Sequence, residues 1–337
     1  MKKIAVFHTG GTIAMEKDDN ASVNITGGNA ITEITAAAFK DNFLDNTQIK
    51  LLEHETPIFG APIPSPYITE EHMLKLRKAI LNKIKTDDID GVVITHGTDT
   101  LEETAYFLDI TVPHTIPVVL TGAMRPANET GSDAVKNYQC AIKVDASDQA
   151  KNMGTMVVMN EEIHAARSVT KTHTTNLSTF KSPDLGHIGT IAADGTVIFN
   201  RILPTTPCYE VDALTKKVLL VKAYAGIDSL IFNAIETLPI DGLVIEALGA
   251  GNVPASIVPC LQKIEKRGIP IIIASRCVSG MAQPIYSYPG GGKSLKDEEL
   301  KSVIFASGLS GAKARLKLAV VLENFSNLED IEAEFAR

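Results

Sequence analysis

Short apolar runs alternate with longer amphipathic stretches along this chain. Residues 4–7 and 91–94 contain no polar side chain, which is typical of parallel strands that are buried on both faces. Residues 69–85, between a further predicted strand at 49–54 and the one at 91–94, place apolar side chains at helical spacing. A strand, a helix and a second strand in this order predict a parallel unit with a right-handed crossover.

This alternation continues to the C-terminus and sets the fold class. We expect an α/β protein with two doubly wound α/β domains, a larger N-terminal one at residues 1–200 and a smaller C-terminal one at 218–337. Residues 201–217 contain two prolines and are expected to link them. Further strands are expected at 118–120, 154–159, 218–223, 242–246 and 270–274, a hairpin at 187–200, and helices at 31–44, 101–106, 133–144, 228–236, 255–267, 312–322 and 328–335.

One long polar stretch, residues 15–31, shows neither the helical nor the strand period. We expect a surface loop there, which at this length is typical of a lid or a disordered segment. Gly27 and Gly28 would be the hinge of such a lid.

Composition narrows the classes of function. The chain has 337 residues, a net charge of −8 and no basic run longer than a lysine pair, so we expect small solutes and no nucleic acid as partners. The four cysteines lie far apart and form no C-x-x-C pair, which indicates neither a zinc site nor a disulfide framework. The apolar run after Lys2 and Lys3 is too short for a signal peptide or a membrane span, so we expect a cytoplasmic protein that binds no membrane.

Polar side chains follow two of the predicted strands where those strands end. Residues 95–100 read Thr-His-Gly-Thr-Asp-Thr, and residues 8–12 read His-Thr-Gly-Gly-Thr. Open α/β sheets bind ligands beyond the carboxyl ends of their strands, so we expect the site at these tips. The glycine pair at 10–11 would expose N–H groups to a ligand, and Gly97 would allow a tight bend. Asp99 with Glu102 also matches a capping box that would open the next helix.

Thr12, Thr98 and Lys171 are the candidates for chemistry. A hydroxyl beside a carboxylate, as in Thr98-Asp99, is a candidate nucleophile or water-orienting pair that lacks only a base. Thr12 is a hydroxyl on a glycine turn, and it could equally be an N-cap or an ST-turn. A lone lysine is usually solvated surface, but Lys171 lies among threonines, where it could take a proton from a hydroxyl. Ser65, before a proline, could be an ordinary turn residue.

Taken together, these motifs resemble those of the bacterial-type L-asparaginases of the cytoplasmic type I kind. The resemblance rests on residues 9–14, 95–100, 121–125 and 169–172, and it covers essentially the whole chain. It implies hydrolysis of L-asparagine to L-aspartate and ammonia, with no metal and no cofactor. It also implies that Thr12 is the nucleophile of a covalent β-aspartyl enzyme, and that Thr98 with Lys171 forms a second hydroxyl-base pair.

The same resemblance implies how the substrate is held. Asp99 would bind the α-ammonium group of asparagine, and Ser65 would bind its α-carboxylate. Main-chain N–H groups near Thr98 and Ala123 would stabilise the oxyanion, which an acyl transfer requires. Gly97 is a further expected substrate-binding residue.

The resemblance further implies a homo-oligomer, a dimer or a tetramer, in which Asn252 reaches the active site of a partner chain. Taken alone, Asn252 could also be an N-cap before Pro254. Three features depart from the family. Lys296 stands where an acid is expected, and no tyrosine lies between residues 12 and 66, where a lid tyrosine is common. Tyr288, with Tyr286 close by, is the candidate to replace that tyrosine. Pro66 stands where many relatives carry glutamine or another polar residue.

Two other functions remain open at this point. A subunit of an archaeal-type amidotransferase would use the same domain, but it needs an additional N-terminal domain, and here the catalytic motif begins at His8. A small-molecule binding module of the same fold would sense an amino acid without transforming it. Such a sensor would not need Thr12, Thr98 and Lys171 together, which favours the amidohydrolase.

Overall fold

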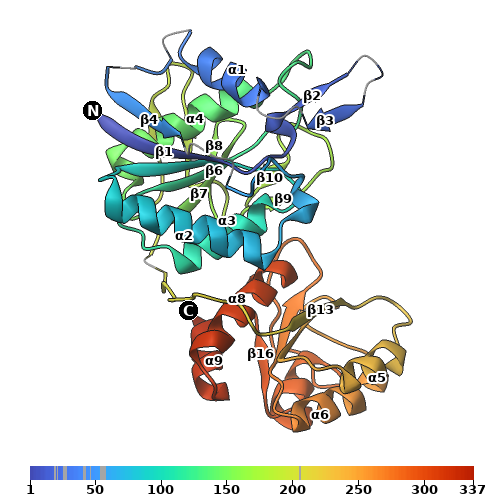
Figure 1. Ribbon diagram of the computed structural model, residues 1–337. Coiled ribbons are helices and arrows are strands. Elements are labelled where there is room, and N and C mark those ends of the chain that lie inside the picture. Colours follow the sequence, from blue (N-terminus) through green and yellow to red (C-terminus); the bar gives the residue numbers. More distant parts are fainter. Residues whose placement is uncertain are drawn as a thin grey trace. The chain divides into compact units, whose positions relative to one another are not determined.

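The computed structural model describes residues 1–18, 20, 22–25, 29–40, 43–45, 47–53, 58–204 and 206–337. The chain divides into two compact units, which we call unit 1 (Met1–Cys208) and unit 2 (Tyr209–Arg337) (Figure 1). Each unit is built on its own sheet with helices packed on it, so the predicted α/β class with a larger N-terminal domain is confirmed. The limits of the linker stay a prediction.

Eight strands form the main sheet of unit 1. Their order across the sheet is β12 (Val197–Phe199), β11 (Gly189–Ile191), β8 (Glu162–Ala165), β7 (Thr155–Met159), β6 (Val118–Thr121), β5 (Gly91–Thr95), β1 (Lys2–His8) and β4 (Ile49–Glu53). The strands from β7 to β4 pair in parallel, and β8, β11 and β12 continue the sheet antiparallel. The chain reaches β4 on one side of β1 and β5 on the other, so the strand order reverses between β1 and β5. Ligands bind at such reversals in open α/β sheets.

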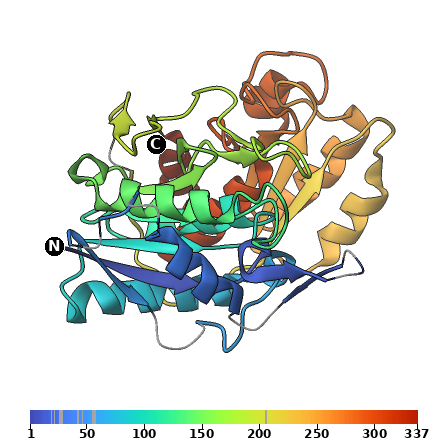
Figure 2. The same cartoon turned by 90° about the horizontal axis from the view of Figure 1, so that it is seen from above.

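Helices cover both faces of this sheet. α1 (Asn29–Ala38) and α4 (Ala134–Ala146) pack together on one face, and α2 (Glu70–Thr86) and α3 (Leu101–Thr111) pack together on the other (Figures 1 and 2). The crossovers through α3 and α4 run in the same direction across the sheet but on opposite faces, so they have opposite hands. The crossover through α4 therefore has the opposite hand to the one through α3. One of the two breaks the strong preference for right-handed crossovers.

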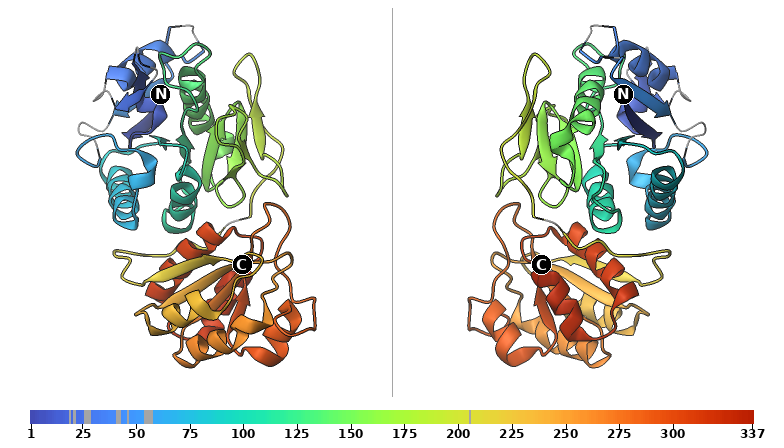
Figure 3. Two further views of the ribbon diagram at one scale, coloured as in Figure 1. Left: turned by 90° about the vertical axis from the view of Figure 1, so that its right-hand side faces the viewer. Right: turned by 90° about the vertical axis from the view of Figure 1, so that its left-hand side faces the viewer.

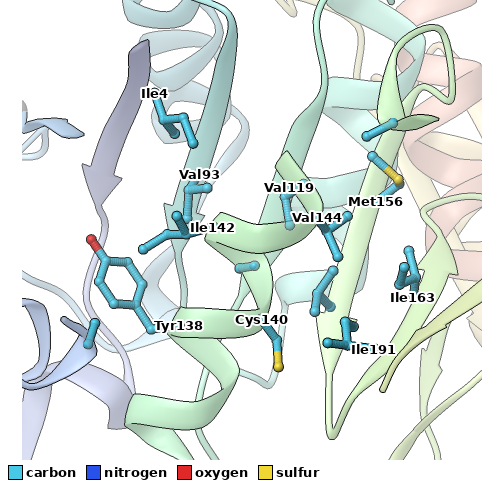
Figure 4. Close-up of a cluster of buried hydrophobic side chains, with 14 of the residues drawn as sticks. Ile4, Val93, Val119, Tyr138, Cys140, Ile142, Val144, Met156, Ile163 and Ile191 are labelled. Carbon is cyan, nitrogen blue, oxygen red and sulfur yellow. The ribbon is translucent and has the colours of Figure 1, made fainter. Parts of the chain in front are cut away.

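The largest buried cluster of unit 1 lies between α4 and the sheet. Figure 4 shows Tyr138, Cys140 and Ile142 of α4 in one cluster with Val93 and Val119 of the central strands. All five side chains are buried, and burial of an aliphatic side chain of this size contributes about 1.5–3 kcal/mol. Every second residue of a strand reaches this face, which leaves the intervening ones for the face under α2 and α3.

Unit 2 contains a parallel sheet of four strands in sequential order. These are β13 (Val218–Lys222), β14 (Gly242–Ala247), β15 (Ile271–Ser275) and β16 (Val303–Phe305). On one face α5 (Ser229–Thr237) packs against α6 (Val258–Lys266), and on the other α8 (Gly311–Asn324) crosses β13, β14 and β15 and carries α9 (Leu328–Ala336) (Figures 1 and 3). The order contains no reversal, so this sheet lacks the switch point that unit 1 has.

Several segments differ from the predictions. The prediction of a plain loop at 15–31 is wrong, because β2 (Met15–Lys17) and β3 (Val23–Ile25) form an antiparallel hairpin. The expected hinge at Gly27 and Gly28 lies outside the described residues. Strands not predicted are β8, β9 (Thr170–Lys171), β10 (Phe180–Lys181) and β16. The glycine-rich stretch leads into α7 (Gly292–Ser294) and a π-helical turn, η5 (Leu295–Glu299).

Most other elements are confirmed with shifted limits. α1 begins and ends earlier than expected, and α3 continues to Thr111. The hairpin at 187–200 is formed by β11 and β12, which pair antiparallel. In the part of the chain that the structure describes, no helix is long and apolar enough to cross a membrane.

Candidate active site

The tips of β1 and β5 touch where the strand order reverses. A Cβ atom on Gly11 would lie 2.1 Å from Cα of Gly97, and one on Gly10 would lie 2.3 Å from the carbonyl oxygen of Ile63. Both glycines of the pair have positive φ, a conformation that other side chains rarely adopt. Thr12 follows directly as the half-buried first residue of a 3-10 turn. The glycine pair therefore carries Thr12 to the tip of β5.

Two predictions about this turn are wrong. The N–H of Gly11 donates to the carbonyl oxygen of Ile63 at 3.2 Å, so it is used within the fold and does not face a ligand. The N-cap of the turn is Gly11 and not Thr12. The two strand tips approach each other so closely that position 11 has no room for a side chain. Glycine therefore occupies the N-cap position, and Thr12 follows as the first residue of the turn.

Ser65 is buried beside the same tip. Its Oγ accepts a hydrogen bond from the main-chain N of Asp99 at 3.2 Å, and its carbonyl oxygen accepts one from Thr100 Oγ1 at 2.8 Å. A Cβ atom on Gly97 would lie 2.7 Å from Ser65 Oγ. Gly97 has no positive φ, so glycine is needed here for close approach and not for the expected bend.

Lys171 reaches this tip from β9. Its Nζ donates to Thr98 Oγ1 at 3.0 Å and to Asp99 Oδ1 at 2.6 Å. The Lys171 side chain is 17% exposed, whereas the Asp99 side chain is 58% exposed. The ammonium group thus lies between a buried hydroxyl and a carboxylate that solvent reaches, and the reading of Lys171 as a solvated surface residue is wrong.

Glu102 contradicts the predicted capping box. The N-cap of α3 is Thr100, and no side-chain hydrogen bond caps this helix. Glu102 Oε2 instead accepts a hydrogen bond from the main-chain N of Lys171 at 2.6 Å, and Asp99 pairs with the lysine ammonium. A capping box is a local pattern, whereas Lys171, which donates to Glu102, is 69 positions away in the sequence. Sequence reasoning therefore missed Glu102 as part of the site.

His96 holds the tip of β5 from inside the fold. Its Nδ1 donates to the carbonyl oxygen of Gly97 at 2.8 Å, because a carbonyl can only accept, and its Nε2 accepts from Thr104 Oγ1 at 2.9 Å. Burial lowers the pKa of His96 from 6.5 to about 4, although the hydrogen bond to Gly97 acts in the other direction. The imidazole is therefore neutral and fixed in one tautomer.

The tip of β6 lies beside the same residues. A Cβ atom on Gly122 would lie 2.5 Å from the carbonyl oxygen of His96 and 3.4 Å from Thr98 Cγ2. Ala123 follows and is completely buried. Asn137 of α4 donates to the carbonyl oxygen of Gly122 at 3.0 Å, which fixes the main chain at this point. The structure therefore brings the third predicted tip next to Thr98.

Asn252 lies in unit 2, after the end of β14. Its Oδ1 accepts a hydrogen bond from the main-chain N of Gly292 at 3.1 Å. The N-cap of the following turn is Pro254, so the reading of Asn252 as an N-cap is wrong. The side chain instead ties the tip of β14 to the start of α7.

Tyr286, Tyr288 and Lys296, which were considered together with Asn252, also lie in unit 2. Tyr286 and Tyr288 are about half exposed, and their ring centroids lie 5.7 Å apart. Lys296, where an acid was expected, pairs with Glu332 of α9 and donates to the carbonyl oxygen of Val303 at 3.2 Å. Lys296 therefore has partners within its own unit.

A metal ion would need a group of ligands of suitable type. Within the ranges that the structure describes, no three His, Cys, Asp or Glu side chains are grouped to hold one. The expectation that the protein uses no metal or cofactor stays a prediction.

Comparison with known proteins identifies the family. Residues 3–204 match the asparaginase N-terminal domain, and residues 217–335 match the glutaminase/asparaginase C-terminal domain. The L-asparaginase of Bacillus licheniformis is 33% identical over 336 residues, which are 99% of each chain. A probable L-asparaginase of Deinococcus radiodurans is 36% identical over 340 residues, which cover 100% of this chain and 98% of the relative.

A solved structure agrees with these sequences. The crystal structure of a probable cytoplasmic L-asparaginase from Campylobacter jejuni matches with a TM-score of 0.84 and 33% identity, and the match covers 100% of both chains. This chain belongs to the asparaginase family, whose members are hydrolases that act on linear amides. The predicted resemblance is confirmed.

Proposed function

We propose that this protein hydrolyses L-asparagine to L-aspartate and ammonia through a covalent threonine intermediate. The observation that carries the proposal is the hydrogen bond from Lys171 Nζ to Thr98 Oγ1 at 3.0 Å, at the reversal point of the sheet and beside the turn that holds Thr12. The relatives from Bacillus licheniformis and Deinococcus radiodurans bear the name L-asparaginase, which supports the choice of substrate.

In the first half of the reaction the hydroxyl oxygen of Thr12 attacks the side-chain amide carbon of asparagine. A C–O bond forms, the C–N bond breaks, and the nitrogen leaves as ammonia with the proton of the hydroxyl. A threonine hydroxyl is a weak nucleophile at neutral pH, so the step needs a proton acceptor and donors for the oxyanion. Main-chain N–H groups at Gly97, Thr98 and Ala123 are the proposed donors.

In the second half water attacks the β-aspartyl ester of Thr12. Lys171, as the neutral amine, acts as the base: it takes the proton of Thr98, which takes one from the water. The protonated Lys171 then returns a proton through Thr98 to the oxygen of Thr12, which leaves with its hydroxyl restored. General-base assistance of this kind contributes about 100- to 10,000-fold in rate. The short distances among Lys171, Thr98 and Asp99 support this assignment.

The substrate ends fit two side chains of the site. The carboxylate of Asp99 would bind the α-ammonium group, and its high exposure keeps it within reach of an entering solute. Ser65 Oγ accepts from the main chain of Asp99, which leaves its own O–H to donate to the α-carboxylate. An amino acid would then present its side-chain amide to Thr12.

Ammonia release tests the proposal. The purified protein should release ammonia from L-asparagine faster than from L-glutamine or D-asparagine, and Thr12→Ala should release none from any of them. An active Thr12→Ala variant would contradict the assigned nucleophile. Aspartate binding without any ammonia release would favour the sensor.

We infer in addition that the protein is cytoplasmic and forms a homo-oligomer. The similar Campylobacter jejuni protein is described as a probable cytoplasmic L-asparaginase, which supports the cytoplasm, although a 33% identical relative from Haemophilus influenzae is described as a probable periplasmic one. Cell fractionation and light scattering test the two inferences separately, and a monomeric or a periplasmic protein would contradict them.

A further inference from the structure

We propose that Glu102 is a positioning residue, which fixes the main chain of Lys171 so that the amine stays at Thr98 when the substrate shares Asp99. The inference rests on the proposed function and deepens it. Three features of unit 1 lead to it: the geometry of the β9–β10 pair, the place of Glu102 in α3, and the double role of Asp99.

The N–H of Lys171 points away from the strand that pairs with it. Phe180 lies opposite Lys171 in the antiparallel register, and the neighbouring pair is hydrogen-bonded, with Thr172 N donating to the carbonyl oxygen of Thr179 at 2.8 Å. Hydrogen-bonded and non-hydrogen-bonded pairs alternate along an antiparallel ladder. Lys171 therefore turns its N–H outward, and Glu102 Oε2 accepts it at 2.6 Å.

Two further hydrogen bonds of this segment hold the two short strands to each other. Thr172 Oγ1 donates to the carbonyl oxygen of Thr179 at 2.7 Å, and His173 N donates to Thr179 Oγ1 at 2.7 Å. These bonds shape the hairpin but do not attach it to α3. The bond from Lys171 to Glu102 does, because Glu102 lies in the first turn of α3.

One short stretch of chain thus holds Lys171 at both of its ends. Thr98 and Asp99 contact the ammonium group, and Glu102, three positions after Asp99, contacts the main-chain N. A lysine side chain has several rotatable bonds, so the position of its amine is only as well defined as the contacts at its two ends.

Asp99 has a second partner in the proposed complex. Its Oδ1 accepts from Lys171 at 2.6 Å in the structure, and the proposed function also assigns its carboxylate to the α-ammonium of the substrate. When the substrate arrives, Lys171 keeps the Thr98 hydroxyl but shares its charged partner with a second ammonium group. The anchor at Glu102 is independent of the substrate, so it limits how far the amine can move away from Thr98.

Two conservative variants at position 102 distinguish the effect of side-chain length from the effect of charge. Glu102→Gln keeps the length and an acceptor oxygen but removes the charge, and Glu102→Asp keeps the charge but is one methylene shorter. We expect Glu102→Gln to retain kcat within about 3-fold and Glu102→Asp to lose about 10-fold or more, because small displacements of a catalytic group are costly in rate. KM and the Kd for aspartate should change little in both variants, since Glu102 does not contact the substrate in this proposal.

A matched control is available in α2. Glu71 is the second residue of that helix, as Glu102 is of α3, and it pairs with Lys75 on the surface at 3.1 Å. Glu71→Asp should therefore leave kcat and KM unchanged. A general effect of shortening a glutamate in the first turn of a helix would appear in both variants, whereas loss of positioning would appear only at Glu102.

Other outcomes would overturn the proposal in distinguishable ways. If Glu102→Asp keeps the parent kcat, or if Glu102→Gln loses as much as Glu102→Asp, Glu102 does not position Lys171. A loss confined to KM would equally rule out this role. Lys171→Met is measured in parallel: unchanged kcat there would overturn the proposed base itself, whereas a large loss together with an active Glu102→Asp variant would overturn only the role of Glu102.

Discussion

Three histidines of unit 1 are neutral in the folded protein, of which His96 and His164 are fully buried. Burial lowers the pKa of His8, His96 and His164 from 6.5 to about 4 in each case. Of these, His96 touches the candidate active site most directly, through its hydrogen bonds to Gly97 and Thr104. The strand tip that carries Thr98 and Asp99 is therefore held by neutral His96, and burial in the fold opposes protonation of this imidazole.

This arrangement predicts a loss of stability in mild acid. The unfolded chain takes up protons below pH 6.5, but folded His96 does so only near pH 4, so its contribution is fully present above pH 6.5 and is lost as the pH falls toward 4. At pH 5 the loss from one such histidine is about 2 kcal/mol. Urea unfolding at pH 7 and pH 5 should show a smaller difference for His96→Gln than for the parent. An equal difference in both proteins would contradict it.

The residues of the site were predictable in part. Thr98 and Asp99 follow a buried strand, and that placement makes them candidates for the site. Lys171 depended on the family resemblance, because β9 is two residues long and rich in hydroxyls, with no apolar period to place it. Glu102 was assigned a local capping role, since its true partner comes from a distant strand. Residues whose roles depend on long-range contacts are those that pattern reasoning misses.

The elements show the same division. β1, β5 and β14 are nearly continuous apolar runs, so their places were predicted to within a residue or two. β2 was not, because all three of its residues are half-buried and no alternation of exposed and buried positions exists to be read. The three-residue β16 was missed because so short an apolar run has no period of its own.

The hairpin of β2 and β3 is the described part of the expected lid. Asn128, from the loop after β6, accepts a hydrogen bond from Lys17 N at 2.9 Å and donates to the carbonyl oxygen of Lys17 at 2.8 Å. We expect amide exchange in the hairpin to slow when aspartate binds, since a closing lid excludes water from the acyl intermediate. Identical exchange with and without aspartate would rule out a lid.

Asn128 provides a second measurement on the same hairpin. Asn128→Ala removes both hydrogen bonds to Lys17, so exchange in the hairpin should rise in the empty protein. Exchange in α4, which is packed on the sheet and buried, should not change. Unchanged exchange in the hairpin would show that other contacts hold it in place.

At the scale of the whole molecule, the two units contribute differently. The sheet of unit 1 reverses its order beside Thr98, whereas the sheet of unit 2 has sequential order and no such point. The motifs of unit 1 supply the residues of the candidate active site. The family resemblance implies that Asn252 of unit 2 reaches the active site of a partner chain. The predicted shared site gives unit 2 a role that its own sheet does not supply.

Mixing two inactive variants tests the shared site. Thr12→Ala and Asn252→Ala should each have little activity alone, and mixed oligomers should regain activity because some sites then combine an intact Thr12 with an intact Asn252. Thermal unfolding of Asn252→Ala is the control, since this change also removes the hydrogen bond to Gly292. Mixtures that stay inactive although subunits are shown to exchange would contradict a shared site.

The most direct test of the account is to find the covalent intermediate. The protein is mixed with L-asparagine, quenched rapidly in acid and digested, and its peptides are weighed by mass spectrometry. The account predicts a β-aspartyl group on the peptide that contains Thr12, which Thr12→Ala should lack. A β-aspartyl group on the peptide that contains Thr98 would reverse the two roles, and ammonia release at full rate with no adduct on either peptide would contradict the threonine intermediate itself.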